Sequence, residues 1–388
     1  MNNSTQQPRI PQLRFPAFDG EWEEKRLESV FSEFKSGNNI TSDDISEHGK
    51  YPVYGGNGLR GYTSDFTHDG FYLLIGRQGA LCGNVNRSNG KSYISEHAIA
   101  GKANKTSDTE WLAQRLDYFK LNRLSESSAQ PGLSVGKLLR YKLKFPSLQE
   151  QQKIATFLTA VDDKITKLTS KKEQLTQYKK GVMQQLFSQE LRFQDENGND
   201  FADWEAKRLG KLTYKVGKKN KENIKHPIYS INNQEGFLPQ SEQFDGLNSN
   251  DRGYDISLYK IVESETFAYN PARINVGSIG YSNDLKKVIV SSLYVCFKTN
   301  HELDDQFLLS YLETYNFQKD ILRFQEGGVR QYLFYENFSM IKVPIPSLKE
   351  QQKIASYLSA LDDKIEAVQV QIEKTQEFKK GLLQQLFV

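Results

Sequence analysis

A segment in the middle of this chain of 388 residues returns almost unchanged at its end. Residues 147–155 read Ser-Leu-Gln-Glu-Gln-Gln-Lys-Ile-Ala, and residues 347–355 read Ser-Leu-Lys-Glu-Gln-Gln-Lys-Ile-Ala, 200 positions later (347 minus 147). The likeness continues to residue 187 in the first copy and residue 387 in the second. Roughly half of the positions agree, which is far above chance for an internal comparison. A doubled element that flanks different material indicates two related heads on one repeated scaffold.

Both copies carry apolar residues spaced alternately by four and three positions, the stripe of a coiled coil. No proline or glycine interrupts either stripe before Gly181 or Gly381. Each copy therefore predicts a helix of about 38 residues, on the order of 57 Å long at 1.5 Å per residue. The residues that we expect to pair the helices are Ile154, Leu158, Val161, Ile165, Leu168 and Leu175 in the first copy, and Ile354, Leu358, Leu361, Ile365, Val368 and Ile372 in the second.

Neither helix can bury its stripe alone, so we expect the two to form an antiparallel coiled coil, with one globular domain at each end. The alternative is that each helix packs only on its own neighbouring domain. Four polar residues break the stripes and either fix the register or lie where the helices diverge: Lys172, Lys179, Thr375 and Lys379. The repeated Asp-Asp at 162–163 and 362–363 cannot easily serve one site, because neighbouring helix residues point about 100° apart. Solvated or partner-facing charges are the expectation for them.

Each predicted helix begins with a recognisable signal. Ser147 and Ser347 follow a proline and are natural N-caps, and Glu150 and Glu350 come three residues later. This spacing predicts a capping box, in which the serine and the glutamate each bond a backbone N–H of the first turn.

The two segments outside the helices share their ends and differ in the middle. Both read as short strands with turns, for example at 71–76 and 287–290, followed by a short helix at 110–120 in the first and at 305–317 in the second. The expected fold class is α+β with an internal pseudo-two-fold repeat. The expected domains are a globular domain at 1–146, a long helix at 147–190, a second globular domain at 191–346 and a second long helix at 347–388.

Composition sets few limits on function. The formal net charge of +3 permits a nucleic-acid partner without requiring one. Cys82 and Cys296 are the only cysteines, which suits free thiols in a cytosolic chain. The polar stretch at 1–7 lacks the pattern of a signal peptide, and no apolar run approaches the length of a membrane helix. We therefore expect a cytoplasmic protein with no membrane partner.

Catalytic signatures are missing from the sequence. There is no phosphate-binding loop for ATP and no glycine-rich turn for a dinucleotide or methyl-donor cofactor. The stretch at 270–273, Asn-Pro-Ala-Arg, lacks the second proline and the aromatic residue that an adenine methyltransferase uses to grip a flipped base, so it is read as a turn. The five histidines show no metal-ligand spacing. No catalytic and no metal-binding residue is expected.

Polar, basic and aromatic residues near glycine-rich turns remain. Arginine and lysine suit guanine, asparagine and glutamine suit adenine, and lysine also holds phosphate. Arg77 and Arg273 are the strongest candidates, since each precedes a glycine pair at comparable places in the two halves, although an ordinary solvated or structural role is the alternative for every one. The candidates for contact with DNA are Asn57, Arg60, Tyr62, Arg77, Gln78, Arg87, Lys91, Gln130, Lys218, Lys219, Lys221, Asn232, Asn233, Gln234, Arg252, Arg273, Asn275, Arg330 and Tyr332.

Taken together, these motifs resemble the specificity subunits of type I restriction–modification systems. Each variable segment opens with Trp-x-x-x-Arg-Leu, at Trp22 and Trp204, and closes with Pro-Ser-Leu-x-Glu-Gln-Gln-Lys-Ile-Ala. The resemblance covers nearly the whole chain. It implies two target recognition domains that read the two halves of an asymmetric bipartite DNA target, and two spacer helices that set the spacing and hold the methyltransferase subunits.

The resemblance also implies partners and the absence of catalysis in this chain. Two methyltransferase (modification) subunits and two restriction subunits, which translocate and cut DNA, would complete the complex. S-adenosylmethionine, ATP and magnesium would be bound by those subunits. One rival is a coiled-coil adaptor with two protein- or glycan-binding heads, and another is a self-contained nuclease or methyltransferase, for which no cofactor or metal site is visible.

Overall fold

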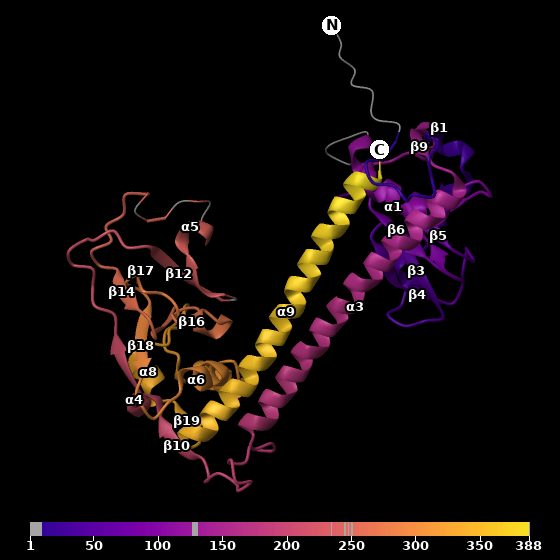
Figure 1. Cartoon of the computed structure of the whole chain (residues 1–388). Coiled ribbons are helices and arrows are strands. Elements are labelled where there is room, and N and C mark those ends of the chain that lie inside the picture. The colour runs from indigo at the N-terminus through magenta and orange to yellow at the C-terminus, as the bar shows by residue number, and fades with distance from the viewer. Residues whose placement is uncertain are drawn as a thin grey trace. The chain divides into compact units, whose positions relative to one another are not determined.

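The computed structural model describes residues 10–125, 131–233, 235–243, 246, 248–249 and 251–387. The chain forms two compact units (Figure 1): unit 1 comprises Met1–Ser170 with Gln369–Val388, and unit 2 comprises Lys171–Val368. The boundary between them falls inside both long helices, α3 (Leu148–Phe187) and α9 (Leu348–Leu386). Each unit therefore holds one globular domain and a part of each long helix. The domain bounds expected from the sequence stay a prediction.

The domain of unit 1 contains two sheets that place its loops. The first is antiparallel with the strand order β2-β8-β5-β6, and the second has the order β4-β3-β7, in which β3 and β7 are parallel. The strands are β2 (Phe31–Ser36), β3 (Tyr51–Gly55), β4 (Gly58–Thr63), β5 (Tyr72–Gly76), β6 (Val85–Ser88), β7 (Tyr93–Ile94) and β8 (Ala98–Ala103).

The domain of unit 2 repeats this topology although its sequence diverges. Its sheets have the orders β11-β18-β15-β16 and β13-β12-β17-β14, and β12 is again parallel to its neighbour β17. The edge strand β14 follows an insertion and pairs with β17 at the place where unit 1 has an isolated bridge between His68 and Ser92. The strands are β11 (Thr213–Val216), β12 (Ile228–Asn232), β13 (Gly236–Pro239), β14 (Lys260–Glu263), β15 (Phe267–Tyr269), β16 (Ile279–Tyr281), β17 (Lys287–Val290) and β18 (Val295–Thr299).

The short helices of the two domains differ in one respect from the sequence prediction. The first is a single helix, α1 (Thr109–Phe119), but the helix expected at 305–317 is broken into α6 (Asp305–Leu312) and α7 (Tyr315–Phe324). The break occurs because Thr314 caps the second helix, its Oγ1 accepting from the backbone N–H of Phe317 at 3.3 Å. The other short elements are α2 (Val135–Arg140), α4 (Leu209–Leu212), α5 (Gln240–Gln243), α8 (Tyr335–Met340), η1 (Leu27–Ser29), η2 (Ser42–Asp44), η3 (Leu121–Leu124) and η4 (Ile274–Val276).

The first strand of each domain pairs with the last. In unit 1, β1 (Glu23–Arg26) is antiparallel to β9 (Lys142–Phe145). In unit 2, β10 (Glu205–Arg208) is antiparallel to β19 (Lys342–Ile345) in the same register. The chain thus enters and leaves each domain at one place, directly before the long helix begins.

The stripes of the long helices are buried together with the domain cores. In unit 1, Ile154, Leu158 and Val161 at the start of α3 share a core with Leu382 and Leu386 at the end of α9, which Figure 1 shows in yellow beside the purple domain. This core includes the domain residues Trp22 and Trp111.

Unit 2 contains the reciprocal arrangement. Val182 and Leu186 at the end of α3 lie with Ile354, Leu358 and Leu361 at the start of α9. Start meets end in both units, so the expected antiparallel pairing and the α+β class are confirmed. The alternative, in which each helix packs only on its own domain, is wrong. Among the remaining expected pairing positions, Val368 and Ile372 are buried, whereas Ile165, Leu168, Leu175 and Ile365 are half-buried.

The expected capping boxes form only in part. Ser147 Oγ accepts from the N–H of Glu150 at 3.3 Å, and Ser347 Oγ accepts from the N–H of Glu350 at 3.4 Å. The two glutamates are fully buried, but their carboxylates do not cap the helix. Instead, each accepts two hydrogen bonds from the arginine of the Leu-Arg-Phe segment that opens the domain. Arg14 donates to Glu150 at 2.8 and 2.7 Å, and Arg192 donates to Glu350 at 3.1 and 2.9 Å.

Lysines that interrupt the stripes pair with the repeated aspartates. Lys379 of α9 lies 2.6 Å from Asp162 of α3 in unit 1, between Nζ and Oδ1, and Lys179 of α3 lies 2.8 Å from Asp362 of α9 in unit 2. The first aspartate of each Asp-Asp pair is therefore held by the partner helix, and the second is exposed. This exchange accounts for the repetition of Asp-Asp-Lys and Lys-Lys-Gly at opposite ends of the two helices.

Candidate nucleic-acid interface

Three chain segments of unit 1 meet at one edge of the domain, which we name edge 1 and define by Asn57, Arg60, Arg77, Gln78 and His97. Arg77 follows strand β5 and donates its backbone N–H to the carbonyl of His97 at 3.0 Å. Gln78 Nε2 lies 3.0 Å from His97 Nδ1. A third segment joins there, because the N–H of Leu133 donates to the carbonyl of Arg77 at 2.9 Å.

Glycine brings the β3–β4 turn into this edge. A Cβ atom placed on Gly56 would lie 2.9 Å from the carbonyl oxygen of His97, closer than a side chain allows. Asn57 follows Gly56 in the turn and Arg60 continues along β4, with its side chain crossing Gly55. The candidates Asn57, Arg60, Arg77 and Gln78 are all exposed.

An equivalent edge forms in unit 2, which we name edge 2 and define by Asn233, Arg273, Asn275 and Tyr332. The turn after β12 approaches the loop after β15, since a Cβ on Gly277 would lie 3.1 Å from the carbonyl oxygen of Asn233. Ser278 Oγ donates to the carbonyl of Ile231 at 2.9 Å and holds the same approach. The segment before α8 joins through the N–H of Leu333, which donates to the carbonyl of Pro271 at 3.0 Å.

Arg77 and Arg273 lie in corresponding loops but are not equivalent in register. The residues whose carbonyl accepts from Leu133 and Leu333 are Arg77 in unit 1 and Pro271 in unit 2. Arg273 is therefore two positions further along its loop. Both arginines are exposed at their edge, so the two edges present the same type of side chain from different backbone positions.

Several candidates lie apart from the two edges or already have other contacts. The guanidinium of Arg87 donates to both carboxylate oxygens of Glu110 at 3.0 and 2.8 Å, and Lys91 lies over the ring of Phe66 at 4.7 Å. Tyr62 is half-buried and bridges to Ser46. The basic run Lys218, Lys219 and Lys221 is exposed and follows strand β11, beside β14.

Five candidates remain to be placed. Arg252 is exposed in the insertion before β14, and Arg330 is exposed in the turn between the bridged residues Glu326 and Tyr332. Asn232 is half-buried at the end of β12. Gln130 and Gln234 lie outside the described residues.

Two side chains at the edges were not among the sequence candidates. His97 holds edge 1 together and also lies 3.1 Å from Glu96, between Nε2 and Oε1. Phe334 stacks on Tyr332 with ring centroids 5.5 Å apart and planes inclined by 4°, and it is 42% exposed. Exposed stacked aromatic rings are a typical surface for nucleobases or sugars. The closely spaced aromatics at 332–335 were the available signal for Phe334, whereas nothing local marked His97.

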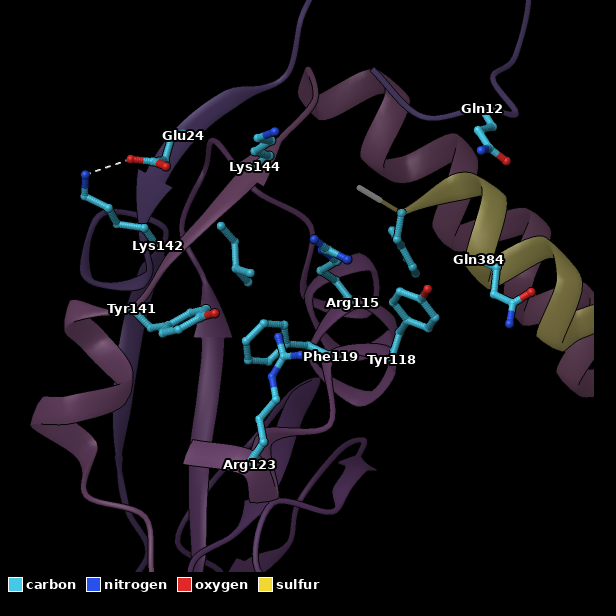
Figure 2. A pocket seen from close by; sticks show the side chains of 12 residues that line it. Gln12, Glu24, Arg115, Tyr118, Phe119, Arg123, Tyr141, Lys142, Lys144 and Gln384 are labelled. Atoms are coloured by element: carbon cyan, nitrogen blue, oxygen red, sulfur yellow. Dashed lines mark hydrogen bonds and ion pairs between the residues drawn. The ribbon is translucent and has the colours of Figure 1, made fainter. Parts of the chain in front are cut away.

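Unit 1 also contains a basic cavity of about 550 Å³ between the end of α1, strand β9 and the end of α9 (Figure 2). Arg115 and Arg123 point into it with Lys144, beside the rings of Phe119 and Tyr141. Arg115 is only 6% exposed, and burial lowers its pKa to about 10. Counted from the capping residues Asp108 and Asp304, the position in unit 2 equivalent to Arg115 is Tyr311.

Among the residues that the structure describes, there is no group of three or more histidine, cysteine, aspartate or glutamate side chains placed to hold a metal ion. Among the same residues, no helix combines the length and the apolar character needed to span a membrane.

The family model for the type I restriction modification DNA specificity domain matches the chain twice, at residues 19–177 and 201–375. Each match covers one globular domain and most of the long helix that follows it. The chain belongs to this family.

Curated relatives agree with this membership. The chain is 40% identical over 161 residues to the EcoprrI specificity subunit of Escherichia coli, a match that covers 40% of either chain. It is 27% identical over 341 residues to a putative type I specificity subunit of Mycoplasma pneumoniae, covering 85% of this chain and 86% of that one. The match to the E. coli relative thus spans less than half of that protein's length.

Solved structures show the same fold in other members of the family. The S subunit of a type I restriction–modification system from M. genitalium aligns over 98% of this chain and 99% of its own, with a TM-score of 0.65 and 20% identity. A chain from a study of complex assembly and conformational transition of a type I system aligns over 94% of this chain with a TM-score of 0.51 and 14% identity.

Proposed function

We propose that this chain is the DNA specificity subunit of a type I restriction–modification complex, in which each domain reads one half of a bipartite double-stranded target. One observation carries the proposal: the family match falls on both halves of the chain, and both halves present an edge of exposed arginine and amide side chains. Because the side chains of the two edges differ, the two half-sites differ in sequence and the target is asymmetric.

The chemistry of the edges suits reading of bases in the major groove. The guanidinium of Arg77 or Arg273 can donate two hydrogen bonds to guanine O6 and N7. The amides of Asn57, Gln78 and Asn233 can bond adenine N6 and N7. Exposed lysines of the run at 218–221 can neutralise phosphates, which contributes affinity without sequence preference.

The long helices set the spacing between the half-sites in this proposal. α3 has 40 residues, which corresponds to about 60 Å at 1.5 Å per residue. Half-sites read from one face of B-DNA are about 34 Å apart, one helical turn. A stiff helix pair of that length bridges them once the width of the domains is included.

Two equivalent aromatic patches on the helices support docking of two methyltransferase subunits. In unit 1, Phe157 and Phe378 line a cavity of about 330 Å³, and Phe378 is 55% exposed. In unit 2, Tyr357 and Tyr178 occupy the equivalent positions, with their hydroxyl oxygens 2.9 Å apart, and Tyr178 is 53% exposed. One patch in each unit suits two copies of the same partner.

The chain takes no direct part in catalysis under this proposal. The methyltransferase subunits would bind S-adenosylmethionine, and the two restriction subunits would bind ATP and magnesium for translocation and cutting.

The decisive experiment is to co-express the chain with the methyltransferase subunits of its own system in a host without other adenine methylation, and to sequence the modified genome. We expect methylated adenine in one asymmetric bipartite motif. Arg77→Ala is expected to relax base preference in one half-site, and Arg273→Ala in the other. A methylome without any bipartite motif, together with DNA affinity that does not fall with salt, would instead favour a two-headed adaptor for protein or glycan ligands.

A further inference from the structure

A chain of polar contacts crosses unit 1 from the sheet of the recognition domain to the helix pair. Arg87 of β6 donates to Glu110 of α1, and Gln114 Nε2 donates to Glu110 Oε1 at 2.8 Å. The same Gln114 amide nitrogen donates to Asp162 Oδ2 of α3 at 3.0 Å. Asp162 in turn is held by Lys379 of α9. Gln114 is thus the link between the domain and the salt bridge that joins the two helices.

The environment of Gln114 makes this link specific. Its side chain is only 3% exposed, and its amide nitrogen has two protons for two carboxylate acceptors. Each of the two carboxylates also pairs with a cation: Glu110 with Arg87, and Asp162 with Lys379. The contacts therefore run from a cation through an anion, the neutral amide and a second anion to a second cation. These part-buried hydrogen bonds favour one geometry, because a small rotation of α1 on α3 would leave the buried amide of Gln114 without its partners.

Among the described residues of unit 2 this series of contacts does not recur, although the salt bridge between the helices is the same. Counting from the equivalent capping residues Asp108 and Asp304, Ser310 occupies the place of Gln114. Ser310 Oγ donates to the carbonyl of Gln306 in its own helix, at 3.0 Å. The salt bridge of unit 2 reaches its domain instead through Lys179 and Glu313, 3.3 Å apart, and the Glu313 side chain is 61% exposed.

We propose that Gln114 is a positioning residue that locks the first recognition domain onto the helix pair and so restricts the spacer length that the complex accepts. The inference rests on the proposed function. Because the contact in unit 2 is exposed and screened by water, the first domain is held more firmly than the second. Restriction of spacer length is therefore contributed mainly by unit 1.

The test uses the complex of the full chain with its methyltransferase subunits, and DNA targets whose spacer is native, one base pair shorter or one base pair longer. Gln114→Leu removes the amide while keeping a side chain of similar size. We expect methylation of the altered spacers, relative to the native one, to rise between about twofold and tenfold, the range that one net hydrogen bond produces in an equilibrium. Base preference in both half-sites should stay unchanged.

Matched variants separate this role from general stability. Ser310→Ala, at the equivalent place in unit 2, is expected to leave spacer preference as in the wild type. Glu110→Gln changes no volume and should loosen spacer preference in the same direction as Gln114→Leu, which keeps the inference testable if the latter unfolds. If either variant folds and methylates altered and native spacers in the same ratio as the wild type, the inference about Gln114 is wrong and the proposed function is unaffected. A wild-type complex that ignores spacer length overturns the role of the helix pair in the proposed function, and the inference with it.

Discussion

Lys179 and Asp362 join α3 to α9 in unit 2, and the equivalent residues Lys379 and Asp162 join the same helices in unit 1 with the roles exchanged. Each helix therefore contributes one lysine and one aspartate. Burial lowers the pKa of Lys179, but its hydrogen bond to Asp362 and the nearby charge of Glu313 outweigh this, so the pKa is raised overall. The ammonium group remains charged at neutral pH and fixes the register of the pair.

The first prediction concerns this register contact. Lys179→Met should lower the free energy of unfolding by about 1 kcal/mol, because the Asp362 partner remains largely solvated. Urea denaturation of Lys179→Met, Asp362→Asn and the double variant measures the coupling. The exposed neighbour Lys180→Met is the matched control and should change little. Additive effects of the two substitutions would contradict a direct contact.

The second prediction concerns the buried carboxylates at the start of the long helices. Glu150→Ala should destabilise unit 1 by about 3 kcal/mol, since it leaves Arg14 beside an emptied buried site. Glu350→Ala should destabilise unit 2 at least as much, because Glu350 also accepts from the indole of Trp204 at 3.1 Å. Thermal unfolding of the two variants checks the order, and a smaller loss for Glu350→Ala than for Glu150→Ala would count against it.

The third prediction follows from His68, which is 5% exposed. Burial, with a smaller effect of Lys35, lowers its pKa below the ordinary 6.5, although Glu33 opposes the shift. Below about pH 6.5 the imidazole of His68 therefore binds a proton more readily in the unfolded chain than in the folded one. The free energy of unfolding is thus highest above that pH and falls on acidification. Denaturation between pH 7.5 and 5.5 should show a flatter stability profile for His68→Gln than for the wild type.

The fourth prediction tests the helix pair as a spacer. One heptad inserted into each long helix, after Ser170 and after Val368, adds about 10 Å at 1.5 Å per residue. At 3.4 Å per base pair this corresponds to about three extra base pairs between unchanged half-sites. Methylome sequencing of the complex with the lengthened chain measures the shift. Retention of the original spacing would refute the spacer role, and an insertion in α3 alone serves as the control with mismatched helices.

The fifth prediction separates phosphate contacts from base contacts. Replacing Lys218 and Lys219 together by alanine should weaken DNA binding equally for all sequences and make its salt dependence shallower, by about 0.9 in logarithmic slope per lost phosphate contact. Arg77→Ala should instead relax the base preference in one half-site. Titrations with matched and mismatched duplexes at several salt concentrations distinguish the two, and sequence-dependent losses for the lysine variant would contradict its assignment.

Local patterns in the sequence were sufficient for the long helices. The four–three spacing, the serine caps and the absence of proline placed α3 and α9 nearly to their observed bounds, and the doubling indicated their antiparallel pairing. The role of Glu150 was beyond such reasoning. Its partner Arg14 is 136 residues away in sequence, whereas the capping-box interpretation uses only neighbours.

The sequence indicated which kinds of residue to expect at the candidate site, but not which individual residues lie there. Glycine-rich turns drew attention to Asn57, Arg77 and Arg273, which the structure places at the two edges, and their contact with DNA stays a prediction. Arg87 had the same sequence features as these candidates, but its guanidinium is bound by the carboxylate of Glu110. That contact depends on the packing of α1 on β6, which local sequence does not reveal. His97 lies at edge 1 because β7 runs parallel to β3, a pairing without a local signal.

The pairing of the first and last strands of each domain has a consequence for how such genes can change. Each domain begins and ends in a two-stranded antiparallel stem that connects it to the long helices. The stem is formed by β1 with β9 in unit 1 and by β10 with β19 in unit 2. Under the proposed function, recombination within the stems would exchange one recognition domain for another while leaving the Arg14–Glu150 and Arg192–Glu350 ion pairs intact. A lineage could thus acquire a new target in a single genetic event, without refolding the rest of the chain.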